Sequence, residues 1–315
     1  FGVENDSLAI IAAGCALFYV DKNFKGRIKH ITSISLLASH EVMGLDEYTI
    51  RNLELFRSLS NQGVHGTLIE TIDKTVTASG SRLLKNWLRQ PLIKSNAIHK
   101  RLGRITEFVE NHSMLDDIQK TLKKVSDIER ILARISSNKF SPRDIVDLGV
   151  SLTNIPFIKE NIKKNNKELT SLTKQFIDTK YIASLMLETL KSDPPNNIKK
   201  GGFIKDGFSF ELDELRKLSA DVSKWMLDMQ MEEQKNTKIP SLKVGYNKIF
   251  GYYLEVTKAH LEKVPNHYIR KQTLTNSERY FTEELKSYEE KILSAEEKIV
   301  SLEYSILENL QSKII

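Results

Sequence analysis

The residues with the clearest chemistry are cations gathered in one segment. Between residues 238 and 282 the chain has eight lysines and arginines against three glutamates, a net charge of +5, while the whole chain carries +6. The following fifteen residues have six glutamates and only two lysines. A basic segment with such sharp limits is typical of a surface that faces a polyanion. A solvated surface whose lysines serve solubility is equally consistent with the charge. The cations are Lys238, Lys243, Lys248, Lys258, Lys263, Arg270, Lys271 and Arg279.

Two predicted β-hairpins must position these cations. Residues 242–247 and 251–257 are rich in β-branched and aromatic side chains and are joined by a short turn. Residues 268–273 and 277–282 have the same character. Each pair of runs therefore predicts one hairpin.

Alternation along the third predicted strand separates its polar side chains. Successive residues of a strand point to opposite faces of the sheet. Arg270 and Gln272 are therefore expected on one face, and Ile269, Lys271 and Thr273 on the other. The basic residues are not all expected to touch the same partner.

Two long helical segments flank the hairpins. In 210–234 and 283–315, apolar residues recur at alternating steps of three and four, which indicates helices with one apolar seam. A helix of about 25 residues is about 38 Å long. If the two helices pair antiparallel, the hairpins lie at the far tip of the pair. The seams are Leu215, Leu218, Val222, Trp225 and Met229, then Leu285, Tyr288, Ile292, Ala295, Ile299, Leu302 and Ile306.

Composition supports a mainly α fold. Only 14 glycines and 7 prolines occur in 315 residues, which favours long uninterrupted helices. Hydrophobic residues at 40% and charged residues at 28% indicate a folded chain and not a disordered one. We expect a long helical bundle with a small β-rich module inserted at the tip of two antiparallel helices.

The apolar run Leu8–Val20 predicts a buried helix, with the single cysteine, Cys15, as an inert core thiol. Its thirteen residues are fewer than the ~20 that cross a bilayer. One cysteine cannot form an internal disulfide, so a cytoplasmic protein is expected. The chain begins without methionine and ends inside a helical pattern, which suggests a piece of something longer.

Catalytic and metal-binding motifs are missing from the sequence. It has no Gly-x-x-x-x-Gly-Lys-Ser/Thr phosphate loop, no His-Glu-x-x-His pair and no Cys-x-x-Cys pair. The acidic residues of the helices are interpreted as solvated faces and intrahelical pairs. No cofactor, no metal and no catalytic residue are expected in this chain. A hydrolase without such motifs would have to show metal-dependent turnover.

Four blocks of the sequence stand in a familiar order: Thr75–Leu92, Asp127–Arg134, Val244–Thr257 and Tyr268–Lys286. Their order and spacing resemble the MutS family of bacterial DNA mismatch repair proteins. The first two blocks resemble core helices of that family and the last two resemble its clamp. The resemblance covers essentially the whole chain.

The resemblance implies four segments. They are the end of a connector domain (1–40), a helical core or lever domain (41–237), a clamp inserted in it (238–290) and a returning lever helix (291–315). In the family, two subunits embrace DNA, and an ATPase domain, using ATP and Mg²⁺, drives a sliding-clamp transition. The mismatch-reading domain and the ATPase are expected outside residues 1–315. This chain is therefore expected to be no enzyme and a monomer, whereas its parent forms a homodimer and binds a downstream repair protein.

The resemblance also implies that the clamp touches the DNA backbone without reading sequence. Six clamp residues are hypothesised to donate hydrogen bonds to phosphate oxygens: Asn247, Arg270, Lys271, Gln272, Thr273 and Asn276. Asn247 and Asn276 are equally well explained as turn residues.

Other clamp residues are interpreted as structural. Arg279 stands beside Glu278 and is taken as half of an ion pair. Tyr252, Tyr253 and Tyr280 could stack on bases, but clamp core is the favoured interpretation. A rival function for the whole chain is a coiled-coil scaffold whose basic tip binds an acidic protein.

Overall fold

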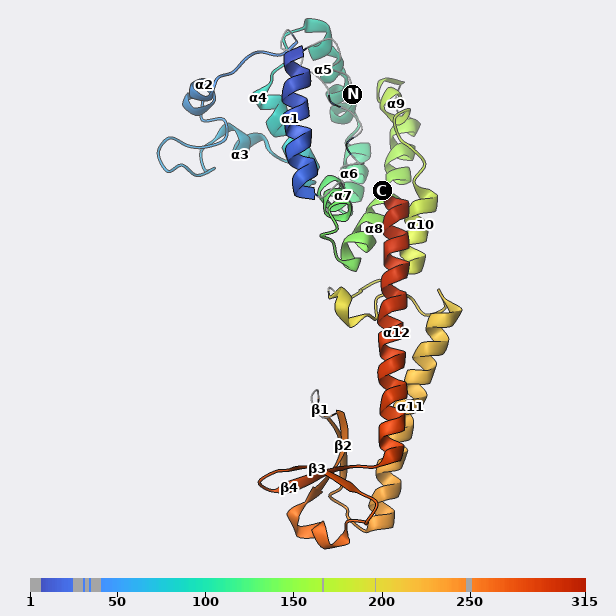
Figure 1. Ribbon diagram of the computed structural model, residues 1–315. Coiled ribbons are helices and arrows are strands. Elements are labelled where there is room, and N and C mark those ends of the chain that lie inside the picture. The colour runs from blue at the N-terminus through green and yellow to red at the C-terminus, as the bar shows by residue number, and fades with distance from the viewer. Residues whose placement is uncertain are drawn as a thin grey trace. The chain divides into compact units, whose positions relative to one another are not determined.

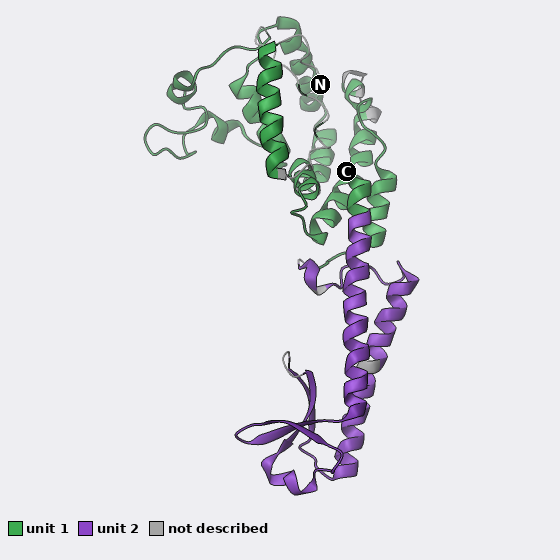
Figure 2. Cartoon of the chain, in the orientation of Figure 1, with its two compact units in different colours: residues 1–196, 310–315 green, residues 197–309 purple. Residues whose placement is uncertain are grey.

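Figure 1 presents a computed structural model of the chain, which describes residues 7–24, 31, 34, 41–165, 167–195, 197–247 and 251–315. Lys248, Phe250 and part of the expected segment 1–40 lie outside the described residues. The chain divides into two compact units, residues 1–196 with 310–315 and residues 197–309 (Figure 2). The expected fold class, mainly α with a small β-sheet, is confirmed. The expected domain limits stay a prediction.

The first unit is built from helices, several of which begin at polar capping residues. The side chains of Asp46, Thr67, Thr77, Asn111 and Asp127 each accept a hydrogen bond from a backbone N–H of the following first turn. Its buried cluster is Met114, Ile118, Ile158, Ile162 and Leu169. The helices are α1 (Ser7–Phe24), α2 (Glu47–Asn52), α3 (Leu68–Ile72), α4 (Ala78–Arg89), α5 (Ser95–Glu110), α6 (His112–Leu122), α7 (Ile128–Ser136), α8 (Pro142–Asn165), α9 (Lys167–Thr173) and α10 (Lys180–Thr189).

Helix α1 differs from expectation. Leu8, Phe18 and Tyr19 are 77%, 72% and 70% exposed, and Cys15 is exposed as well. The interpretation of this segment as a buried helix with a core thiol is therefore wrong for the described part of the chain. Its apolar residues surround the helix instead of forming one stripe, so the sequence did not specify a face or what would cover it. Within the described ranges, no helix has the length and apolarity to span a membrane.

The second unit holds two long helices and a four-stranded sheet. The sheet order is β1-β2-β4-β3, and every neighbouring pair is antiparallel. Both predicted hairpins are present, as β1–β2 and β3–β4. The elements are η1 (Ile198–Lys200), α11 (Phe210–Thr237), β1 (Lys243–Asn247), β2 (Gly251–Thr257), η2 (Lys258–Lys263), β3 (Ile269–Thr273), β4 (Ser277–Phe281) and α12 (Glu283–Ile314), whose last residues belong to the first unit.

Helices α11 and α12 lie side by side next to the sheet (Figure 1). The rings of Trp225 and Tyr288 stack with centroids 3.5 Å apart. Met229 and Leu285 are buried in one cluster with residues of the sheet. The predicted seam therefore holds near the sheet. At its other end it fails, because Leu218 is 48% exposed.

Further along α12, a buried carboxylate makes the contact with α11. Glu303 is fully buried, and its two oxygens have separate partners. Oε1 accepts from Arg216 of α11 at 2.6 Å, and Oε2 accepts from the backbone N–H of Gly202 at 2.6 Å and of Phe203 at 3.3 Å. Glu303 thus joins α12, α11 and the 201–203 loop. The interpretation of helical carboxylates as solvated is wrong at this residue.

Candidate nucleic-acid interface

The sheet has one face that packs on the helices and one that does not. Leu254, Val256 and Tyr280 are buried on the first, in the cluster that includes Met229 and Leu285. Residues paired across strands share a face, so the register defines the second, which we call the open face. It carries Lys243, Gly245, Asn247, Tyr253, Glu255, Gln272, Arg279 and Phe281.

A layer of side chains crosses the open face from strand to strand. The guanidinium of Arg279 lies 4.1 Å from the centroid of the Tyr253 ring. Its Nε donates to Glu255 at 3.0 Å, and a terminal nitrogen donates to Gln272 at 3.0 Å. Arg279 therefore pairs with Glu255 and not, as expected, with its sequence neighbour Glu278. The Tyr253 ring covers Gly245, where a Cβ would lie 2.7 Å from the ring.

We expect Gly245→Ala to destabilise the sheet by about 1–2 kcal/mol, because the added methyl displaces the Tyr253 ring from under Arg279. Urea unfolding followed by circular dichroism measures this. The matched background is Tyr253→Ala, which removes the clash, so Gly245→Ala should then cost close to nothing. If Gly245→Ala costs the same in both backgrounds, the Tyr253 ring does not cover Gly245.

A β-bulge rearranges the predicted faces of β3. Arg270 pairs with Tyr280 and Gln272 pairs with Arg279, so three residues of β3 oppose two of β4. The prediction that Arg270 and Gln272 share a face is therefore wrong. The Lys271 ammonium lies 5.2 Å from the centroid of the Phe281 ring, on the open face with Gln272.

Arg270 and Thr273 lie on the opposite face of the sheet from Gln272. Arg270 is exposed, and one of its terminal nitrogens lies 3.7 Å from Glu278. Thr273 pairs with Glu278 and is also exposed. A phosphate that contacts these two of the six predicted residues must therefore approach from the other side of the sheet.

Asn247 and Asn276 lie at opposite ends of the sheet. Asn247 pairs with Gly251 at the β1–β2 turn, whereas Asn276 is exposed in the turn between β3 and β4. The backbone carbonyl of Asn276 accepts from Lys258, which directly follows β2. The seven residues of β2 separate the two ends by about 20 Å.

The Asn247 end of the sheet faces carboxylates. Gly251 has a φ of +71°, and a Cβ there would lie 1.7 Å from Oε1 of Glu289. Burial raises the pKa of Tyr252, and the nearby charges of Glu296 and Glu289 raise it further. Carboxylates of α12 therefore make this end unfavourable for phosphate.

The opposite end and the open face are basic. Lys243, Lys258 and Lys271 are exposed, and the one carboxylate on the open face, Glu255, is paired with Arg279. Lys243 and Lys258 belong to the basic segment but are not among the six predicted contact residues. Alternation along β1 places Lys243 opposite Glu255, on the same face as Arg279, and this signal could have identified it.

The tyrosines of the second hairpin belong to the core. Burial and a hydrogen bond to Glu278 raise the pKa of Tyr280 to about 12. Burial and a hydrogen bond to Glu233 likewise raise the pKa of Tyr268. Tyr252 packs against the same cluster. Tyr253 differs, since its ring lies on the open face beneath Arg279.

Residues 48–315 match the family MutS domain III. The chain belongs to the MutS family. A DNA mismatch repair protein MutS from Halothermothrix orenii is 40% identical over 287 residues, which is 91% of this chain and 32% of that relative. MutS of Caldanaerobacter subterraneus is 39% identical over 313 residues, 99% of this chain and 36% of that relative. The chain thus spans about a third of the length of these curated relatives.

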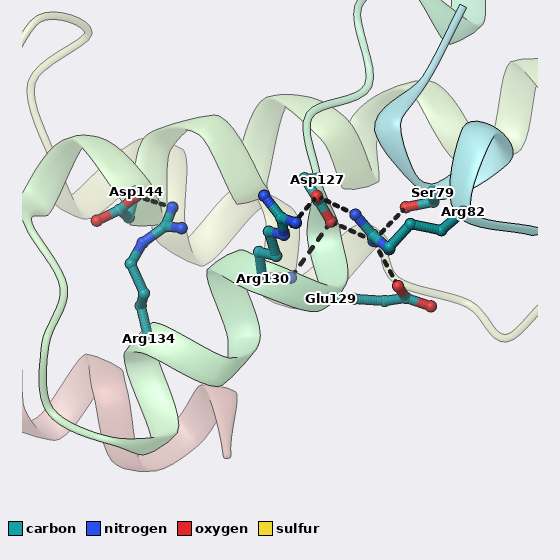
Figure 3. Close-up of polar contacts among 7 residues, drawn as sticks. All are labelled: Ser79, Arg82, Asp127, Glu129, Arg130, Arg134 and Asp144. Atoms are coloured by element: carbon teal, nitrogen blue, oxygen red, sulfur yellow. Dashed lines mark hydrogen bonds and ion pairs between the residues drawn. The ribbon is translucent and has the colours of Figure 1, made fainter. Parts of the chain in front are cut away.

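The two MutS-like blocks of the first unit meet through an arginine (Figure 3). Arg82 of α4 donates to both carboxylate oxygens of Asp127, at 2.6 and 2.7 Å, and also binds Glu129. Asp127 caps α7, and Arg130 lies 3.5 Å from it. Arg134 of the same block pairs with Asp144 of α8. The resemblance related this block only to core helices of the family. Among the described residues, no cluster of three or more His, Cys, Asp or Glu side chains could hold a metal ion.

We expect Asp127→Asn to destabilise the first unit by about 1–2 kcal/mol at neutral pH. The Arg82 hydrogen bonds lower the pKa of Asp127 from 3.8 to about 2. Since the folded-state pKa lies below the unfolded one, the stabilisation is complete above about pH 4 and is lost as the pH falls towards 2. Urea unfolding at a series of acidic pH values checks this. The exposed Asp116, replaced by Asn, is the control and should change the free energy of unfolding at neutral pH by less than about 0.5 kcal/mol.

Proposed function

We propose that the sheet of this chain binds the phosphate backbone of duplex DNA without reading its sequence. The support comes from the open face and from the end of the sheet at the 274–276 turn. Lys243 and Lys271 are exposed on that face, and Lys258 is exposed at that end. Glu255, on the open face, is neutralised by Arg279. Away from the Asn247 end, Glu255 is the carboxylate that the register places on this face, and it is paired, so the cations there attract phosphate oxygens through charge, which carries no sequence information. The two hairpins fix the spacing of these cations.

The six expected contact residues take different parts in this proposal. Lys271 supplies charge on the open face, and Gln272 donates its amide beside it while its oxygen accepts from Arg279. Asn276 presents its side chain at the basic end. Arg270 and Thr273 approach a phosphate from the other face of β3. Asn247 contributes least, because it lies at the end that faces Glu289.

For the parent protein, we propose a role in DNA mismatch repair, the function in the names of its relatives. The helices α11 and α12 then act as levers between the sheet and an ATPase domain outside this chain. ATP and Mg²⁺ belong to that domain. The parent acts as a homodimer on mismatched duplex DNA and hands over to a downstream repair protein. This chain alone is not proposed to hydrolyse ATP.

Salt titration of binding to random-sequence duplex DNA tests the proposed function. The plot of log K against log salt should be linear, and Lys271→Ala should reduce its slope by about one. Lys123→Ala, an exposed lysine of the first unit, is the control and should leave the slope unchanged. Indifference of the slope to Lys271→Ala would favour the scaffold that binds an acidic protein.

A further inference from the structure

A recess in the first unit surrounds Phe56. It consists of two adjoining cavities of about 420 and 660 Å³, which share Phe56 and Arg89 as lining residues. We call them together the Phe56 recess. Volumes of this size suit a ligand the size of a few amino-acid side chains.

Three arginines converge on the smaller cavity. Arg51, Arg57 and Arg89 line it, and Glu47 is the only carboxylate that does so. In the described part of the chain, none of the three arginines forms an ion pair. Arg89 instead lies with its guanidinium 5.0 Å from the centroid of the Phe56 ring. The cavity therefore presents unneutralised positive charge around an aromatic ring.

The floor of the recess is apolar and its wall is held in place. Ile50 and Phe56 line the smaller cavity, and Val64, Ile69 and Val76 line the larger. The 54–67 loop that carries Phe56 and Val64 is tied by its own hydrogen bonds. The Glu54 carboxylate accepts from Ser58 and from the backbone of Leu59, and the Thr67 hydroxyl donates to the Val64 carbonyl. Such a preformed recess loses little entropy when a ligand binds.

We propose that the Phe56 recess binds an acidic peptide segment in which carboxylates flank an apolar side chain. The apolar side chain fills the space over Phe56, and the flanking carboxylates pair with Arg51, Arg57 and Arg89. Bidentate pairing with guanidinium groups favours carboxylates there.

The carboxylates of the recess favour a peptide over a polyphosphate. Glu70 and Asp73 line the larger cavity. Asp73 accepts from the hydroxyls of Ser81 and Thr75, both at 2.6 Å, and these bonds lower its pKa. These fixed negative charges repel a nucleic-acid backbone, which carries a phosphate at every nucleotide, whereas a peptide places its carboxylates only at the arginines of the smaller cavity and its backbone N–H groups at Glu70 and Asp73. This proposal does not depend on the DNA-binding function proposed for the sheet.

Panning a library of random dodecapeptides against the 315-residue chain tests the proposal. Enriched peptides should carry Asp or Glu on both sides of a Leu, Phe or Trp. In fluorescence anisotropy, Arg51→Glu/Arg57→Glu should weaken the best peptide about tenfold or more. Arg89→Gln, which keeps a polar side chain of similar length, should weaken it by a smaller factor.

The charge-matched control is Lys123→Glu/Lys124→Glu, two exposed lysines of the same unit, which should change the affinity less than about twofold. Circular dichroism verifies that each variant folds. Lys271→Ala should leave peptide binding unchanged, which separates this site from the sheet. Enriched peptides without acidic residues, no enrichment, or an affinity unaffected by the arginine variants would overturn the proposal. So would competition by a short DNA duplex that requires the same arginines.

Discussion

Glu303→Ala should destabilise the second unit by about 3–5 kcal/mol, the largest effect on stability that we expect. Glu303 is fully buried, and the substitution removes the acceptor for Arg216 and for two backbone N–H groups of the 201–203 loop. A buried donor without a partner costs its full desolvation free energy. Chemical denaturation, followed by circular dichroism, measures the change in the free energy of unfolding.

The same helix offers a matched control for this substitution. Glu297 is exposed on α12, so Glu297→Ala should change the free energy of unfolding by less than about 0.5 kcal/mol. Glu303→Gln retains one acceptor oxygen and should lie between the two. If Glu303→Ala and Glu297→Ala cost the same, the buried carboxylate does not hold the loop to the helices.

The combined substitution Lys243→Ala/Lys258→Ala/Lys271→Ala should weaken duplex binding about 100-fold at low salt. The three exposed ammonium groups supply charge on the open face and at the basic end of the sheet. The slope of log K against log salt should fall by about three, because each lysine that neutralises a phosphate contributes about one to it. Anisotropy titrations with duplexes of unrelated sequence should all show this weakening.

The control for this triple variant removes the same charge elsewhere. Lys100, Lys123 and Lys124 are exposed in the first unit. Their replacement by Ala should change the slope by less than one, since general attraction by net charge is weak and screened by salt. Equal weakening in both triple variants would mean that net charge, and not the sheet, determines binding.

Local patterns predicted the elements of the second unit closely. The β-rich runs became two hairpins within a residue of the expected limits, and the three-four spacing became α11 and α12. These predictions succeeded because hairpins and amphipathic helices are determined by neighbouring residues. The packing of Met229 and Leu285 against the sheet follows from the same seams.

Partners distant in sequence were missed. No local pattern marks Arg82 as the partner of Asp127, 45 residues away, or Glu303 as the acceptor of Gly202. The bulge in β3 was also not predictable from the sequence, since neither Arg270 nor Lys271 is a glycine or proline, the residues that indicate a bulge in a strand. One extra residue was enough to place Gln272 and Arg270 on opposite faces of the sheet.

The buried cluster that Leu254 and Val256 of the sheet share with Ile292 of α12 gives the sheet a second attachment to that helix. The first is covalent, at Thr282, where β4 leads into the helix. A body joined to a rod at two separate points cannot swivel about it. A load applied at the 274–276 turn therefore moves the sheet and its helix together.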